Sequence, residues 1–370
     1  MLKNIENSLK KAKAKQIQYG LNKLIVTITT NTSKNSQNIY FSPIRIINNK
    51  LIFGLVIYTR KQLISLAKLI QKYADIIFID AEKKIPYSIG DKFFSLYKAE
   101  KTKIKKILKK EKKTTLEYVE LGNLVSTAKT LIKNKPIFEF KPNDITVDHA
   151  WLILSDYFKS LGSKNVALIG SGNIGFKLAL KLVESGSTVN LYRRNINLNS
   201  YLANSINLIK PKSTLATANA VDDKIKCCIG VDALIGCSNE INIIDEKMIK
   251  AMRPNGIILD VGKGNVKNSA VKFAEKKSIK LIRCDISETL SHYINLYSNY
   301  KFDKGNYGRK KFNSIYCVSG GYVGKKNDIV VDNFKFPSQI LGIADGSGKF
   351  KKQKSVKDKK NIKELKKHFK

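Results

Sequence analysis

The sequence predicts an α/β protein in which an N-terminal α/β domain precedes a doubly wound parallel sheet. Apolar, β-branched runs of strand length alternate with amphipathic segments of helix length along most of the chain. At 165–184 a strand, a glycine-rich turn and a helix follow one another directly. The 370 residues, 43% of them hydrophobic, are enough for two domains that each bury a core.

Lysine dominates the charge of the chain. Lys and Arg number 68 against 30 Asp and Glu, a formal net charge of +38, yet only seven residues are Arg. Because Arg is the usual residue for bidentate phosphate and base contacts, we interpret the excess as a solvated lysine surface rather than a nucleic-acid site. No apolar run approaches the roughly 20 residues that span a bilayer, so we expect no membrane partner. The five cysteines lack metal-ligand spacing, which predicts a cytoplasmic protein with reduced thiols and no metal.

The first domain is predicted at 21–142, behind a basic N-terminal arm at 1–20. Its expected strands are Leu24–Thr30, Leu51–Tyr58 and Ile76–Ile79. Its first expected helix, Gln62–Tyr73, lies between the second and third strands. This strand–helix–strand order is typical of parallel pairing. The lysine-rich block Lys98–Lys113 is expected to form an exposed helix. A linking helix is predicted at 143–162, where Asn143 or Asp144 can cap its start.

The strongest chemical signal is the glycine-rich loop after the strand Val166–Ile169. The loop comprises Gly170, Ser171, Gly172, Asn173, Ile174 and Gly175. Its glycines are spaced G-x-G-x-x-G in the strand–turn–helix–strand setting that the dinucleotide fingerprint requires. The first permits the tight turn, the second lets a pyrophosphate approach the backbone, and the third allows the helix to pack closely on the strand. We therefore predict a Rossmann domain at 163–300, with the phosphates at the positive end of its first helix.

The end of the next strand indicates which dinucleotide is bound. NAD sites usually carry a carboxylate there, which hydrogen-bonds the ribose 2′-hydroxyl. This chain instead has Tyr192 followed by Arg193 and Arg194, two of its seven arginines. Guanidinium groups bind a 2′-phosphate that a carboxylate would repel. The predicted cofactor is therefore NADP, with Arg193 as the first contact and Arg194 as the second.

Two later loops are expected to face the nicotinamide ring, because ligands bind at the carboxyl ends of parallel strands. Their predicted cofactor contacts are Cys237 and Ser238 after one strand, and Val261, Gly262 and Lys263 after the next. Beyond the Rossmann domain, the segment 301–346 is expected to return over the cleft. The lysine-rich tail 347–370 is expected to be disordered.

The layout and motifs resemble the two-domain, amino-acid-dehydrogenase-like enzymes, which include methylenetetrahydrofolate dehydrogenase/cyclohydrolase and shikimate dehydrogenase. Pro142–Thr146 opens the linking helix, as a Pro-Thr turn does in the folate enzymes, and Asp260-Val261-Gly262 matches their DVG after a later strand. The resemblance covers roughly residues 20–345 in layout and 143–263 in motif. It implies a substrate held between an α/β catalytic domain and the Rossmann domain.

The resemblance also implies a catalytic lysine from the first domain. Lys61 lies near Tyr58 much as in the Y-x-x-x-K of the folate enzymes, although the spacing here is one residue shorter. Lys83 and Lys84 follow a strand's carboxyl end and are the other candidates. A lysine beside a carboxylate can move a proton while hydride moves to or from a nicotinamide. The linking helix offers two such carboxylates, Asp144 and Asp148.

Together these features predict an NADP-dependent oxidoreductase, a dehydrogenase or reductase acting on a small polar, anionic metabolite bound between two domains. The alternative is a non-catalytic NADP-sensing or nucleic-acid-binding protein that uses its lysine-rich surface. A homodimer is possible, but no residue pattern in the sequence identifies an interface.

Overall fold

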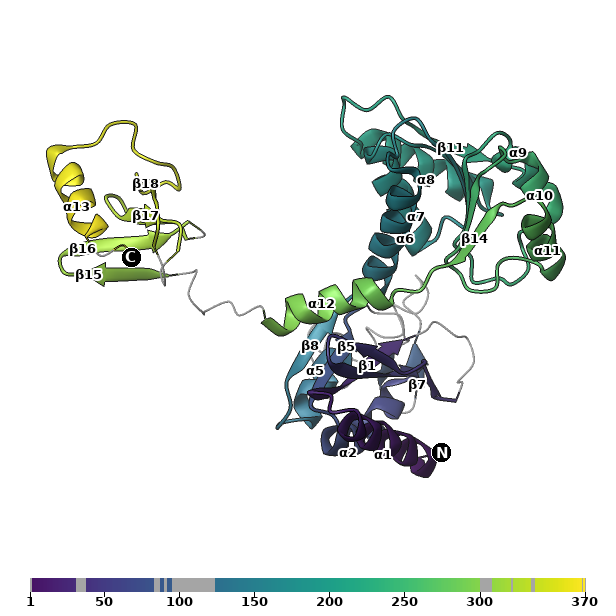
Figure 1. Ribbon diagram of the computed structural model, residues 1–370, viewed down its shortest axis with the longest axis horizontal. Helices are drawn as coiled ribbons and strands as arrows, with labels where there is room; N and C mark the ends of the chain where they lie inside the picture. Colours follow the sequence, from purple (N-terminus) through teal and green to yellow (C-terminus); the bar gives the residue numbers. More distant parts are fainter. Residues whose placement is uncertain are drawn as a thin grey trace. The chain divides into compact units, whose positions relative to one another are not determined.

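The computed structural model describes residues 2–30, 38–82, 87–89, 92–94, 124–299, 308–320, 322–333, 337–367 and 369. The chain forms two compact units, Met1–Tyr297 and Ser298–Lys370 (Figure 1). The first unit contains two largely parallel sheets joined by a helix. Within the described residues, no helix is both long enough and apolar enough to cross a membrane.

The first sheet has the strand order β2-β4-β1-β5-β8, with β3 paired to β4. Its strands are β1 (Lys23–Thr30), β2 (Tyr40–Phe41), β3 (Arg45–Ile47), β4 (Lys50–Ile57), β5 (Ile76–Asp80) and β8 (Ile137–Phe140). The central strands β4, β1, β5 and β8 are parallel, as the strand–helix–strand pattern predicts, whereas β2 and β3 run antiparallel to β4. A separate hairpin joins β6 (Tyr87–Ile89) to β7 (Lys92–Phe94). The lysine-rich block 98–113 lies outside the described residues.

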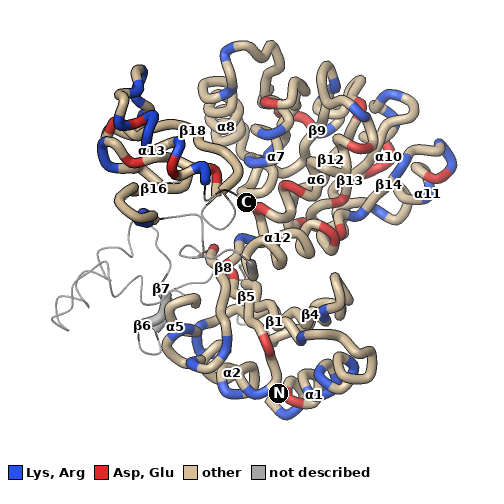
Figure 2. The backbone as a smooth tube through the Cα atoms, turned by 60° about the vertical axis from the view of Figure 1, so that its left-hand side comes forward, with Lys and Arg blue, Asp and Glu red and all other residues tan. Residues whose placement is uncertain are grey.

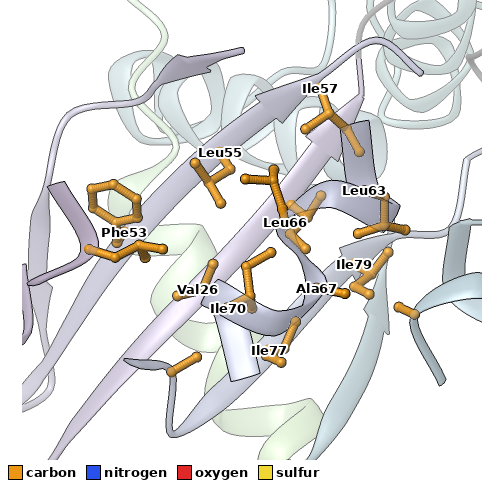
Figure 3. Close-up of a cluster of buried hydrophobic side chains, with 14 of the residues drawn as sticks. Val26, Phe53, Leu55, Ile57, Leu63, Leu66, Ala67, Ile70, Ile77 and Ile79 are labelled. Carbon is orange, nitrogen blue, oxygen red and sulfur yellow. The ribbon is translucent and has the colours of Figure 1, made fainter. Parts of the chain in front are cut away.

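Helices cover both faces of this sheet. One face packs against α1 (Leu2–Gln18), α2 (Arg60–Tyr73) and α5 (Leu124–Leu131), where Val26 meets Leu66 and Ile70 (Figure 3). The other face packs against α12 (Ser287–Asn299), whose Leu290 and Ile294 lie among Ile25 and Phe78. Alternate residues of β1 therefore pack into two different cores, because successive side chains of a strand point to opposite faces of the sheet.

The first twenty residues were predicted as a basic, partly helical arm; they are helical, but the helix packs on the first sheet and does not form a separate arm. Ile5, Leu9 and Ala12 of α1 are buried in the first core. Lys13 donates hydrogen bonds to Asp75, at 2.8 and 3.0 Å, and Asp75 also accepts from the backbone of Leu24 at 2.7 Å. These apolar residues are spaced i, i+4 and i+7 among the lysines, so the helix is amphipathic. Its apolar face packs on the sheet.

A 17-residue helix, α6 (Pro142–Phe158), links the two sheets. Proline occupies its first turn, where the missing N–H costs nothing, and Lys159 ends it in the left-handed conformation at φ 58°. The helix starts one residue earlier than predicted and ends before Gly162.

The second sheet is fully parallel with the order β11-β10-β9-β12-β13-β14. Its strands are β9 (Asn165–Ile169), β10 (Thr188–Tyr192), β11 (Ala218–Val221), β12 (Ala233–Gly236), β13 (Ile257–Asp260) and β14 (Lys280–Arg283). Its flanking helices are α7 (Asn173–Glu184), α8 (Ile196–Ile209), α9 (Lys224–Cys228), α10 (Glu246–Ala251) and α11 (Asn268–Lys276). In chain order the strands read 3-2-1-4-5-6, the Rossmann arrangement that the glycine motif predicts. Two separate cores, one on each face, confirm the double winding.

The described residues of the C-terminal unit form a four-stranded sheet and one helix. It contains β15 (Arg309–Phe312), β16 (Ile315–Ser319), β17 (Ile329–Val331), β18 (Ile340–Ile343) and α13 (Val356–Lys366). The tail is not disordered, contrary to expectation. Ser355 and Asp358 form a capping box at the start of α13, and Leu365 packs with Ile315 and Ile329. The segment 301–346 belongs to this unit, and its expected return over the cleft stays a prediction.

The burial of α1 predicts the effect of truncating its central side chain. Leu9 is fully buried, so Leu9→Ala should lower the free energy of unfolding by about 2–5 kcal/mol through lost burial and a residual cavity. The exposed neighbour Lys11→Ala should change it by no more than about 0.5 kcal/mol. Urea unfolding followed by circular dichroism measures both, and equal effects of the two variants would mean that α1 is not part of the core.

Candidate functional site

A cavity of about 1060 Å³ lies at the carboxyl ends of β9, β10 and β12 and extends to the first sheet and the linking helix. Its described lining residues are Thr30, Glu82, Lys141, Asn143, Ile169, Gly170, Ser171, Gly172, Asn173, Ile174, Lys177, Tyr192, Arg193, Arg194, Asn195, Lys224, Cys237, Ser238, Asn239, Glu240 and Ile243. This is the point where the strand order of a Rossmann sheet reverses, and it is where such sheets bind ligands.

The glycine-rich loop has the local geometry that its spacing predicts. Gly170 has φ 106°, and a Cβ there would come within 2.9 Å of the backbone of Cys237 and Ser238. A Cβ on Gly175 would collide with the carbonyl oxygen of Gly170, so only glycine lets α7 pack this closely on the turn. Gly172, the N-cap of α7, has open space around its Cα. Backbone N–H groups at the start of α7 are therefore accessible to a phosphate.

Three cations, Arg193, Arg194 and Lys224, line the cavity near the ends of β10 and β11. The guanidinium of Arg193 donates to the carbonyl oxygen of Ser171 at 3.1 Å, which holds this side chain beside the glycine loop. Arg194 forms an ion pair with Glu240 at 2.7 Å, although 81% of its side chain is exposed. Lys224 also lines the cavity and lies 5.8 Å from the ring of Tyr192. Lys224 was not predicted, because its position at the start of the short helix after β11 does not distinguish it from the other lysines of the chain.

A buried asparagine hydrogen-bonds to the backbone of the loop after β12. Asn265 is fully buried, and its amide donates to the carbonyl oxygens of Ser238 at 2.9 Å and Glu240 at 2.6 Å. Asp260 in turn accepts backbone N–H groups from Lys263 and Asn265, at 2.9 and 3.3 Å. These bonds fix the loop that faces the cavity.

Only some of the predicted nicotinamide contacts line the cavity. Cys237 and Ser238 line it, whereas Val261, Gly262 and Lys263 are not among its described lining residues. Gly262 instead lies against the carbonyl oxygen of Ser238, where a side chain would not fit. Burial raises the pKa of the Cys237 thiol well above its usual range, so this side chain stays protonated at neutral pH.

A polar cluster lines the part of the cavity between the first sheet and α7. The ammonium of Lys177 lies 2.5 Å from one oxygen of Asp144, and the ammonium of Lys141 lies 2.6 Å from the other. Lys177 also lies 3.9 Å from Glu82, whose side chain is only 11% exposed. Asp80 positions Glu82 by accepting its backbone N–H at 2.8 Å. The cluster thus joins three segments that lie far apart in the sequence.

Two asparagines complete this cluster. Asn143 donates its backbone N–H to Glu82 at 3.2 Å and its side-chain amide to Asn173 at 3.2 Å. Asn173 is the first residue of α7, so a direct hydrogen bond joins the start of the linking helix α6 to the start of α7.

Asp144 and the lysines beside it shift the pKa values in the cluster. Burial alone would raise the pKa of Asp144, but the hydrogen bonds and charges of Lys141 and Lys177 lower it below its ordinary value. The hydrogen bond and charge of Asp144 raise the pKa of Lys141. At neutral pH Asp144 is therefore ionised and Lys141 is a cation.

The predicted catalytic residues separate into three groups. Asp144 contacts two lining lysines. Asp148 instead bonds to Lys181 and to the hydroxyl of Tyr293, beside a second cavity of about 770 Å³. Lys61 is exposed near the start of α2 and is not among the described residues that line the first cavity, and positions 83 and 84 lie outside the described residues. Lys177, Lys141 and Glu82 were not predicted as a group. They come from three separate segments, and they meet only because α6 packs on α7 and Asn143 bonds to Glu82.

The described residues contain no group of three or more His, Cys, Asp or Glu side chains arranged to hold a metal ion. The expectation of a metal-free protein stays a prediction.

Comparison with known proteins gives similarity at the level of solved structures. No family model matches the chain, and no curated protein matches it. A shikimate dehydrogenase solved with NADP+ is 15% identical, with 76% of this chain and 92% of that chain covered and a TM-score of 0.42. An L-tryptophan dehydrogenase from Nostoc punctiforme is 14% identical, with 76% and 77% covered and a TM-score of 0.43. Ornithine carbamoyltransferase from Pyrococcus furiosus is 10% identical, with 79% and 93% covered and a TM-score of 0.43.

Proposed function

We propose that this protein is an NADP-dependent dehydrogenase or reductase whose substrate is a small, polar, anionic metabolite. The observation that carries the proposal is one continuous cavity with two different ends. One end has the glycine loop and three cations, and the other has the cluster of Lys141, Lys177 and Glu82. A dinucleotide laid across the sheet would reach from the first end toward the second.

The first end supports NADP rather than NAD. In a sheet with the order β10-β9-β12, the pyrophosphate lies over the glycine loop at β9, the adenosine toward β10 and the nicotinamide toward β12. Arg193, Arg194 and Lys224 then surround the position of the 2′-phosphate. None of these residues is a carboxylate. Glu240, a carboxylate that lines the same cavity, forms an ion pair with Arg194.

The second end supports binding and protonation of an anionic substrate. A lysine ammonium has three N–H donors, and Lys141 and Lys177 each direct one toward Asp144. Their remaining donors can hold a carboxylate or phosphate of the substrate. NADP(H), when bound, accepts or supplies the hydride.

Lys177 is the candidate for the accompanying proton transfer. When hydride reaches a carbonyl or imine carbon, the π electron pair moves to oxygen or nitrogen, which then takes a proton from the Lys177 ammonium. Asp144 stabilises the cation before transfer, and the proton is restored from solvent. The lysines at positions 83 and 84 directly follow Glu82 in the sequence and stay candidates for the same step.

The cofactor assignment predicts the effect of removing one guanidinium. Arg193→Ala should weaken NADPH binding roughly ten- to a hundred-fold, because a charge-assisted contact to phosphate contributes about 1.5–3 kcal/mol. NADH, which lacks the 2′-phosphate, should bind the variant and the parent protein about equally. Calorimetric titration with both nucleotides measures this. A parent protein that binds neither nucleotide would overturn the proposed function.

The proton-transfer assignment predicts different outcomes for two lysines one helical turn apart. Lys177→Met should lower kcat about 10²- to 10⁴-fold in a substrate screen that follows NADPH absorbance. Lys181→Met, the matched control, removes a lysine of α7 that pairs with Asp148 outside the cavity, and it should leave kcat within about twofold of the parent. Equal losses in both variants would show that the α6–α7 ion pairs matter only for structure.

A further inference from the structure

A buried pair of polar side chains lies beside the glycine loop. Ser171, within the loop, is 1% exposed, and Asn199, on the inner face of α8, is fully buried. Ala203, one helical turn further along α8, is buried as well and packs in the core of the second sheet. Burying a polar side chain costs stability unless it is hydrogen-bonded, so an asparagine at this position must be explained by its bonds.

Two hydrogen bonds fix the orientation of the Asn199 amide. Its Nδ2 donates to the backbone carbonyl of Leu191 at 2.7 Å, and its Oδ1 accepts from the hydroxyl of Ser171 at 3.0 Å. A carbonyl can only accept, so the amide nitrogen must face Leu191 and the amide oxygen must face Ser171. Through this one side chain, Asn199 joins the glycine loop to the end of β10.

The position of Arg193 depends on that of Ser171. The guanidinium of Arg193 donates to the backbone carbonyl of Ser171 at 3.1 Å, and the N–H of Gly170 donates to the carbonyl of Tyr192 at 3.0 Å. Together with the bonds of Asn199, these contacts join the loop to three successive residues at the end of β10. Anchoring the side chain of Ser171 restricts its backbone, and with it the carbonyl that holds Arg193.

The helix α8 brings no charged side chain to the site. It contains no Lys, Arg, Asp or Glu, and its tube in Figure 2 carries neither blue nor red. Any effect of Asn199 on an anionic ligand must therefore pass through its hydrogen bonds. Replacing it by another neutral residue changes no charge, so a change in nucleotide preference would report a change in position.

We propose that Asn199 is a positioning residue that sets the preference for NADPH over NADH. It holds Ser171, the carbonyl of Ser171 holds the guanidinium of Arg193, and Arg193 binds the 2′-phosphate. A long side chain that is already held loses less conformational freedom when the phosphate binds. Asn199 is not among the described residues that line the cavity, so it acts only through the other two. The inference rests on the proposed function, because it needs NADPH in the cavity.

Calorimetric titration with NADPH and NADH tests the proposal, with the ratio of the two dissociation constants as the readout. This ratio cancels any effect on the parts that both nucleotides share. Asn199→Ala leaves Arg193 in place but no longer held, so the preference for NADPH should fall about three- to tenfold. Ser171→Ala removes the same hydrogen bond from its other partner and should have a similar effect. In an Arg193→Ala background, Asn199→Ala should change the ratio no further.

Asn207→Ala is the matched control. Asn207 lies about two turns further along α8, where its amide donates to the carbonyl of Ala218 at 2.8 Å and accepts from the N–H of Ala218 at 2.9 Å. Like Asn199, it joins α8 to the backbone of a strand, but it has no bond to the glycine loop. Both alanine variants should lower the thermal midpoint, whereas Asn207→Ala should keep the nucleotide preference of the parent protein.

The outcomes separate this inference from the proposed function. A folded Asn199→Ala variant with the preference of the parent protein would overturn the inference and leave the proposed function intact. So would an equal loss of preference in Asn207→Ala, because Asn199 would then matter only for structure. If Asn199→Ala does not fold, Ser171→Ala gives the same test. A parent protein that binds neither nucleotide, or binds both equally, would overturn the proposed function and this inference with it.

Discussion

The candidate site depends on how closely three backbone segments approach one another at the glycine loop. Gly175 lies against the carbonyl of Gly170, and Gly170 lies against the backbone at Cys237. No side chain fits at either contact, so α7 starts directly above the end of β9 and beside the loop after β12. The position of α7 then decides which residues of that helix can reach the rest of the molecule, including Lys177 one turn from its start.

The ion pairs between α6 and α7 follow from that placement. Asp144 and Asp148 are four residues apart on α6, and Lys177 and Lys181 are four apart on α7, so the helices meet through two matching pairs. The first pair lies at the cavity and the second outside it. Solvent-exposed pairs contribute little stability, but partly buried ones fix relative position. The first pair therefore holds the ammonium of Lys177 at the wall of the cavity.

Much of this architecture could be predicted from local pattern. The glycine spacing and flanking strands identify the Rossmann domain, and Arg193 could be predicted as a cavity residue because it directly follows a strand. Lys177 and Lys224 could not be found in this way, since a lysine-rich sequence offers no contrast between a surface lysine and one in a cavity. The helix α1 was misread for the same reason. Its lysines suggested a solvated arm, although burial depends on the apolar residues between them.

Energy transfer from the single tryptophan tests the account most directly. Trp151 lies on the linking helix, where its indole N–H donates to Ser185, the C-cap of α7, at 3.0 Å and Lys181 lies 4.7 Å from its ring. NADPH bound in the cavity should quench Trp151 emission saturably and gain sensitised nicotinamide emission. Adenosine 2′,5′-bisphosphate, which occupies only the adenosine end, should reverse both signals. Trp151 emission that stays unchanged up to millimolar NADPH, after correction for light absorbed by free NADPH, would contradict a dinucleotide site between the two sheets.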